Sequence, residues 1–225
     1  MNDAIGTVLP YAIGVAISPV PIIAVILMLF SARARQNGVA FLAGWVIALL
    51  AVGGIVLILA KAGRVGESSD ATNLAALVEA LFGLLLLLMA GRQWRGRPAE
   101  GQAPVMPKWM ATIDSFTTGR SFGLAALLAG PNPKNLMLTV GAALAIVTTG
   151  ATGIDAIIGL VVFVVLGSLS VALPVLYYLA AGDGARVRLD AMKAWLVANN
   201  ATVMATLLLV LGVVLIGKGI EALRT

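Results

Sequence analysis

Gly130-Pro131-Asn132-Pro133-Lys134-Asn135 lies in the middle of a hydrophobic stretch that runs from Ser121 to Val147. The two prolines cannot donate backbone hydrogen bonds and therefore interrupt a helix, while Lys134 places a charge beside the interruption. At membrane depth, irregular backbone and a charge are tolerated only where they face protein or a water-filled cavity. A second motif, Ser18-Pro19-Val20-Pro21, interrupts the first hydrophobic segment in the same way. Paired interrupted helices are typical of transporters.

The composition is that of an integral membrane protein. Of 225 residues, 60% are hydrophobic and only 11% are charged, with a mean hydropathy of +1.04, whereas soluble domains carry about 25% charged residues. The chain has no cysteine and no histidine, which excludes disulfides, thiolate chemistry and histidine metal sites. The net charge of +5 comes mostly from loops, where it indicates topology and anionic lipid rather than nucleic acid. No cleavable signal peptide is evident, so we expect the first helix to be retained.

Six segments are long enough to span a bilayer, which takes about 20 apolar residues each. The expected spans are 4–30, 38–60, 73–91, 121–147, 156–181 and 195–217. The charged residues inside them are Glu79 in the third span and Lys134 in the fourth. The sequence therefore predicts an all-α membrane protein with six transmembrane helices, arranged as a single transmembrane domain over residues 1–225.

The basic residues of the loops are unevenly distributed. Ten lie in the loops after spans one, three and five, and four lie on the opposite side. Because cytoplasmic loops carry the excess of Lys and Arg, we expect the first group in the cytoplasm and both termini outside. The longest connection, about 92–120, is predicted to form a cytoplasmic loop and then an interfacial helix, with Trp109, Ile113 and Phe116 on one face.

The two Pro-x-Pro motifs are separated by half the chain. Pro19 and Pro131 are 112 residues apart, and the same offset carries span two onto span five. Three spans in each half would reverse the second half in the membrane, giving a 3+3 inverted repeat with broken first and fourth helices. Repeat one would cover about 1–91 and repeat two about 121–225. The alternative is that each proline pair, Pro19 with Pro21 and Pro131 with Pro133, only kinks its own helix.

Lys134 is the strongest candidate for a substrate-binding residue. A lysine at the bilayer centre costs about 2.5–3.5 kcal/mol, so it needs a partner or a function. Its ammonium, together with the positive end of a broken helix, suits a phosphate or carboxylate headgroup. Glu79 is the expected counter-charge. Either protonation of Glu79 releases Lys134 for a substrate anion, or the two residues form a static structural pair.

Three polar residues beside the breaks are further candidates. Asn132, Asn135 and Ser18 either bond backbone groups that the prolines leave free or contact polar parts of a substrate. The sequence contains no motif of a hydrolase, an ATPase or a zinc protease. We therefore expect no catalytic residues, no metal site, no cofactor and no enzymatic activity.

The motifs resemble those of a known family. Asp114-Ser115-Phe116, Thr118-Gly119-Arg120-Ser121-Phe122-Gly123-Leu124 and Asn132-Pro133-Lys134-Asn135-Leu136, with Ile17-Ser18-Pro19-Val20-Pro21-Ile22-Ile23, are similar to the peptidoglycolipid-addressing protein (GAP) family. That family includes the sulfolipid-addressing proteins and belongs to the lysine exporter superfamily. The resemblance covers essentially the whole chain. It implies a multi-pass protein of the bacterial plasma membrane that exports complex envelope glycolipids or moves them between leaflets.

Three functions remain open at this stage. The leading hypothesis is a flippase or exporter of an envelope glycolipid, a polyprenyl lipid or another anionic lipid, working by alternating access. The alternatives are an exporter of a small metabolite such as an amino acid, and an accessory subunit of a larger lipid transporter. Expected partners are membrane lipids, a second copy in a homodimer and a larger envelope-lipid export machinery, but not nucleic acid.

Overall fold

Helices make up every regular element in the residues that the computed structural model describes, 2–62, 69–97 and 108–222. The α-helices are α1 Asn2–Ala16, α2 Pro19–Phe30, α3 Ala34–Ala62, α4 Ser69–Arg95, α5 Thr118–Ala129, α6 Pro133–Thr148, α7 Gly153–Ala181 and α8 Arg186–Ala222. Two short 3₁₀-helices, η1 Lys108–Ser115 and η2 Gly182–Ala185, precede α5 and α8. No strand occurs in these residues, so the predicted all-α class is confirmed.

Each Pro-x-Pro motif lies where one helix ends and the next begins. α1 ends at Ala16 and α2 begins at Pro19, with a bend of 57° between them. α5 ends at Ala129 and α6 begins at Pro133. In both cases a proline occupies the start of the following helix, where its missing N–H sacrifices no bond within that helix.

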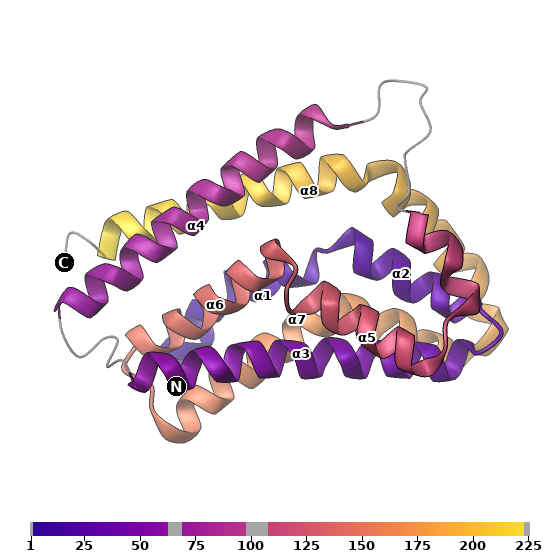
Figure 1. The fold of residues 1–225 in the computed structure, drawn as a ribbon, viewed down its shortest axis with the longest axis horizontal. Coiled ribbons are helices and arrows are strands. Elements are labelled where there is room, and N and C mark those ends of the chain that lie inside the picture. The colour runs from indigo at the N-terminus through magenta and orange to yellow at the C-terminus, as the bar shows by residue number, and fades with distance from the viewer. Residues whose placement is uncertain (1, 63–68, 98–107, 223–225) are drawn as a thin grey trace.

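The helices form two unequal layers (Figure 1). α4 and α8 pack against each other along their length and make up the smaller layer. The remaining α-helices form a compact body, in which α1 packs on α6 and α7, and α3 packs on α5, α6 and α7. α2 packs on α8 and links the body to the smaller layer. The two broken helices therefore belong to the body.

Glycines let the helices of the body approach closely. A Cβ atom at Gly44 would stand 2.3 Å from the Phe122 carbonyl oxygen, so α3 and α5 are in contact backbone to backbone. A Cβ atom at Gly141 would stand 2.5 Å from the ring of Tyr11, which is itself fully buried between α1 and α6. Such small residues are typical of membrane helices, where close packing and polar contacts drive association.

By length and composition, the long helices are those of a membrane protein. In the part of the chain that is described, three stretches are long and apolar enough to cross a bilayer: Ala34–Ala62, Ala76–Arg95 and Gly153–Glu221. The bent pair α1–α2 makes a fourth. The last stretch contains both α7 and α8, which the sequence assigns to separate spans, and α5 and α6 are each shorter than a bilayer requires. The number of six spans therefore stays a prediction.

The chain repeats its order of elements. A broken pair followed by two long helices occurs first as α1–α2, α3 and α4, and again as α5–α6, α7 and α8. α1 begins and α8 ends at the same end of the molecule (Figure 1). The inverted relation of the halves and the placement of that end outside the cell stay predictions. The predicted interfacial helix corresponds to η1, with Met110 and Ile113 buried, while residues 98–107 of the predicted loop lie outside the described residues.

Candidate functional site

The first break leaves carbonyl oxygens of α1 without their usual partners. In an unbroken helix the N–H groups of residues 19 and 21 would bond the carbonyls of Val15 and Ile17, but both residues are proline. The Ser18 N–H bonds the carbonyl two residues before it, which leaves the Gly14 carbonyl free as well. The Ser18 hydroxyl donates to the Val15 carbonyl at 2.7 Å. Gly14 and Ile17 still need a donor.

Lys134 supplies that donor from the second broken helix. Its Nζ atom lies 2.8 Å from the Gly14 carbonyl oxygen, 3.1 Å from the Ile17 carbonyl oxygen and 2.5 Å from Ser18 Oγ. An ammonium group has three N–H donors, so these contacts use all of them. The residue is 3% exposed. The ammonium also lies at the C-terminal end of α1, where the helix dipole favours a positive charge.

Two asparagines satisfy the backbone of the second break. Asn132 caps α6, since its side-chain oxygen accepts from the Lys134 N–H at 3.1 Å. Asn135 Nδ2 donates to the Leu128 carbonyl oxygen in the last turn of α5 at 2.9 Å. Asn132, Asn135 and Ser18 therefore take the backbone-satisfying role that was one of their two predicted roles. Their contact with a substrate stays a prediction.

The predicted contact between Glu79 and Lys134 is not formed, which corrects the expectation that the two carry opposite charges of one pair. The Glu79 carboxylate instead accepts a hydrogen bond of 2.6 Å from the Tyr11 hydroxyl on α1. The physical reason is that the first break offers Lys134 three hydrogen-bond acceptors on the helix against which α6 packs. Glu79 lies on α4, which packs mainly on α8. A proton switch acting directly between Glu79 and Lys134 is not supported.

Several buried polar atoms in the body have no hydrogen-bond partner among the described residues. They include Asn135 Oδ1 beside the second break, Trp45 Nε1 on α3 and Ser168 Oγ on α7. Unsatisfied buried groups are uncommon in folded proteins and call for an explanation such as a bound water or ligand. Trp45 and Ser168 were not predicted as site residues, because a tryptophan and a serine within apolar helices look like ordinary core residues.

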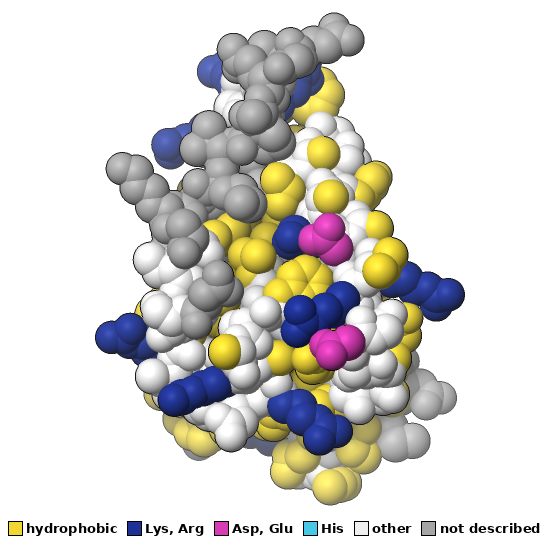
Figure 2. All heavy atoms as spheres, turned by 90° about the vertical axis from the view of Figure 1, so that its right-hand side faces the viewer, with side chains coloured by type: hydrophobic (Ala, Val, Ile, Leu, Met, Phe, Trp, Pro, Cys, Tyr) yellow, Lys and Arg dark blue, Asp and Glu magenta, His cyan; other side chains and the backbone are white. Residues whose placement is uncertain are grey.

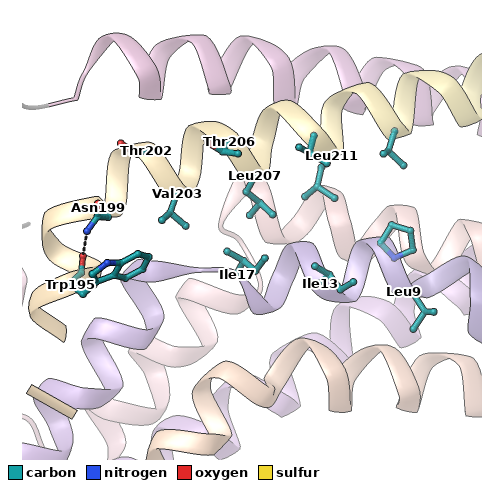
Figure 3. Close-up of a pocket in the computed structure, with 13 residues that line it drawn as sticks. Leu9, Ile13, Ile17, Trp195, Asn199, Thr202, Val203, Thr206, Leu207 and Leu211 are labelled. Carbon is teal, nitrogen blue, oxygen red and sulfur yellow. Dashed lines mark hydrogen bonds between the residues drawn. The ribbon is translucent and has the colours of Figure 1, made fainter. Parts of the chain in front are cut away.

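A groove runs between α1 and α8 along the outside of the body (Figure 3). Its volume is about 710 Å³, and its walls are formed by Leu9, Pro10, Ile13 and Ile17 of α1 and by Trp195, Asn199, Thr202, Val203, Thr206, Leu207, Val210, Leu211 and Val214 of α8. Ile13 and Ile17 point towards α8 across the groove (Figure 3). The lining is almost wholly apolar, with three polar side chains on α8.

The groove borders the first break. Ile17 is both a residue of its wall and the residue whose carbonyl accepts a hydrogen bond from Lys134. Gly14, the other carbonyl partner of Lys134, packs against Leu211 at the floor of the groove. An apolar groove thus passes beside the buried contact between Lys134 and the first break.

These features define a class: an α-helical membrane protein whose two broken helices meet at a buried lysine, next to a groove with an apolar lining. The chain matches the family described as Sap, sulfolipid-1-addressing protein, over residues 8–221, and so belongs to it. No curated protein and no solved structure matches the chain significantly. The family links the chain to sulfolipid addressing. Its placement in the lysine exporter superfamily stays a prediction.

Proposed function

We propose that this protein moves an envelope lipid with a polar or anionic headgroup across, or out of, the bacterial plasma membrane. The observation that carries the proposal is the shared residue Ile17, which lines the α1–α8 groove and accepts a hydrogen bond from Lys134. A single lipid molecule could then place its headgroup at the break and its acyl chain in the groove. Such a lipid would keep its tails in an apolar medium throughout.

Lys134 is the proposed headgroup-binding residue. Its present partners are two neutral carbonyls and a hydroxyl. An anionic headgroup would add the Coulombic attraction between opposite charges to the hydrogen bond. Moving the ammonium from α1 to a headgroup would release the carbonyls of Gly14 and Ile17. Headgroup binding would thus be coupled to a conformational change at the first break. Ser18, Asn132 and Asn135 would provide further polar contacts to the headgroup.

Alternating access would use the repeated order of elements. In the body, α1 packs on α7 and, reciprocally, α3 packs on α5, as expected when two halves of three spans each are related by inversion. Each half would contribute one broken helix to the site. We propose six spans, both termini outside and rocking of the halves about the Lys134 contact.

A second candidate is an accessory subunit of a larger envelope-lipid export machinery. The observation in its favour is the burial of Lys134, whose three donors are all satisfied within the chain. In that case Lys134 would fix the packing of α6 on α1, and the groove would hold a structural lipid or a partner helix. Export of a small metabolite as a monomer or homodimer is the remaining alternative, and the apolar lining of the groove does not favour it.

The test is a headgroup-accessibility assay in proteoliposomes. Purified protein is reconstituted with phosphatidylglycerol whose fluorescent headgroup is bleached by external dithionite, and the rate at which inner-leaflet headgroups become accessible is measured. We compare the wild type with Lys134→Met and with Lys193→Met, which removes a partly exposed lysine that pairs with Asp190 and lies over the Phe30 ring, away from the helix breaks. The proposal expects a protein-dependent rate that falls about tenfold or more in Lys134→Met alone. Equal rates in wild type and Lys134→Met would exclude Lys134 as the headgroup site, and no wild-type activity would favour the accessory role.

A further inference from the structure

A second pocket lies at the opposite end of the molecule from the two termini. It has a volume of about 890 Å³ and lies between the α2–α3 turn and the connection from α7 through η2 to α8. Figure 2 faces this end and shows basic side chains spread over it, with acidic side chains beside some of them. Unlike the α1–α8 groove, this pocket has a largely polar lining.

The pocket carries an excess of positive charge. Arg33 and Arg35 come from the α2–α3 turn and the start of α3, and Arg186 begins α8. The one carboxylate in the lining, Asp183, pairs with Arg186 Nε at 2.8 Å and is itself largely exposed. Within the described residues, neither Arg33 nor Arg35 has an ion-pair partner. Three guanidinium groups thus face one carboxylate.

Buried hydrogen bonds fix the turn that carries two of these arginines. The Ser31 hydroxyl donates to the Met28 carbonyl at 2.7 Å. Asn37 Nδ2 donates to Ser31 Oγ at 3.3 Å and to the Phe116 carbonyl oxygen at 3.0 Å, which ties the turn to the segment before α5. Ser31 and Asn37 are both buried. Arg33 and Arg35 therefore project from a rigid base, which lowers the entropy lost when they bind a ligand.

Exposed apolar side chains lie one helical turn from lining residues on both walls of the pocket. Val39 is four residues after Arg35 on α3 and 49% exposed, and Leu176 is three residues before Leu179 on α7 and 55% exposed. A ligand that combines an oxyanion with an apolar chain would fit this arrangement, because guanidinium groups bind phosphate and sulfate oxygens in bidentate geometry. A free inorganic anion would use the arginines but not the apolar surface.

We propose that this basic pocket binds the phosphate or sulfate ester of a lipid headgroup at the membrane surface, through Arg33, Arg35 and Arg186. The binding site goes beyond the proposed transport function, because it does not require Lys134 or any movement of lipid. If transport also occurs, the pocket would hold the headgroup before it reaches the helix breaks.

Binding is tested with the purified full-length protein in neutral detergent micelles. Phosphatidylglycerol or phosphatidylcholine is titrated in, and the thermal unfolding midpoint is followed by circular dichroism, since a ligand that binds the folded state raises it. A third titration uses inorganic phosphate against chloride at equal ionic strength. The variant Arg33→Gln/Arg35→Gln is compared with Arg120→Gln/Arg188→Gln, which removes the same charge from exposed positions outside the pocket.

The proposal expects phosphatidylglycerol to stabilise the wild type and the control variant equally, and more than phosphatidylcholine does. In Arg33→Gln/Arg35→Gln the apparent Kd for phosphatidylglycerol should rise about tenfold or more, because two charge-assisted contacts are lost. Equal affinities in the two double variants, or equal effects of the two lipids, would overturn the pocket assignment. Stabilisation by inorganic phosphate as strong as that by the lipid would overturn the lipid as its ligand. Because no lipid movement is measured, a loss of transport in Lys134→Met leaves this result unaffected.

Discussion

The body with its two broken helices and the α4–α8 pair are held together in different ways. In the body, side chains satisfy backbone groups that the prolines leave free, with Lys134 of α6 bonded to two carbonyls of α1. In the α4–α8 pair, backbone meets backbone. A Cβ atom at Gly83 would stand 2.7 Å from the Gly212 carbonyl oxygen, and one at Gly212 would stand 2.9 Å from that of Gly83. Glycine contacts bring helices together in both regions, and the body has in addition the polar bridges across its helix breaks.

Few hydrogen bonds join the two regions, and two of them involve α1. Among the described residues, Tyr11 donates to Glu79 of α4, and Lys218 Nζ of α8 lies 3.5 Å from the Thr7 carbonyl oxygen. Lys218 Nζ also lies 5.0 Å from the centre of the Tyr11 ring. Because the groove runs between α1 and α8, we expect changes at these contacts to affect it.

The largest expected effect comes from removing the polar bridge in the body. Lys134→Met keeps the length of the side chain but leaves the carbonyls of Gly14 and Ile17 without a donor, at a cost of about 1–3 kcal/mol each. We expect the free energy of unfolding, measured by circular dichroism in mixed micelles with increasing sodium dodecyl sulfate, to fall accordingly. Lys193→Met, at an exposed ion pair, is the control. A Lys134→Met protein as stable as that control would mean that the bridge does not hold the body.

A smaller effect is expected from filling the contact within the α4–α8 pair. Gly83→Ala places a methyl group against the Gly212 backbone and the Ile216 side chain, and such overpacking costs about 1–3 kcal/mol. Gly91→Ala, two turns further along α4, has open space around the new Cβ atom and should be neutral or slightly stabilising. The same unfolding measurement compares them. Equal stabilities would show that the pair is not packed at Gly83.

The smallest effect on stability is expected at the contact between the two regions. Tyr11→Phe removes the hydrogen bond to Glu79 and should cost about 0.5–1.5 kcal/mol. Glu79→Gln retains an acceptor for the Tyr11 hydroxyl and should cost less. The rate of lipid movement in proteoliposomes should nevertheless change more in Tyr11→Phe than in Glu79→Gln, because only the former detaches α4 from α1. The opposite order would point to the charge of Glu79, rather than the hydrogen bond, as the functional feature.

The helix breaks were predictable because the loss of an N–H group at proline is a local property of the sequence. Lys134 stood out for the same reason, as a charge within an apolar segment. Its partners were not predictable, since they depend on which carbonyls the first break frees and on the packing of α6 against α1. Glu79 was assigned to the wrong partner because Tyr11 looks like a core aromatic residue. The groove was not predicted because its lining is apolar. In the sequence its lining residues look like any other apolar surface residues, and only the packing of α1 and α8 brings them together.

The proposed path of the lipid runs along the α1–α8 groove beside the first break. Its most direct test is the rate of headgroup movement in proteoliposomes after the groove is filled. Val203→Trp places a large side chain in the groove, whereas Leu169→Trp places the same side chain on exposed α7 surface outside it. If the tryptophan blocks the groove, the rate of headgroup movement in Val203→Trp should fall at least about tenfold. The rate in Leu169→Trp should be unchanged, and the two variants should be equally stable. Wild-type rates in Val203→Trp would contradict the account.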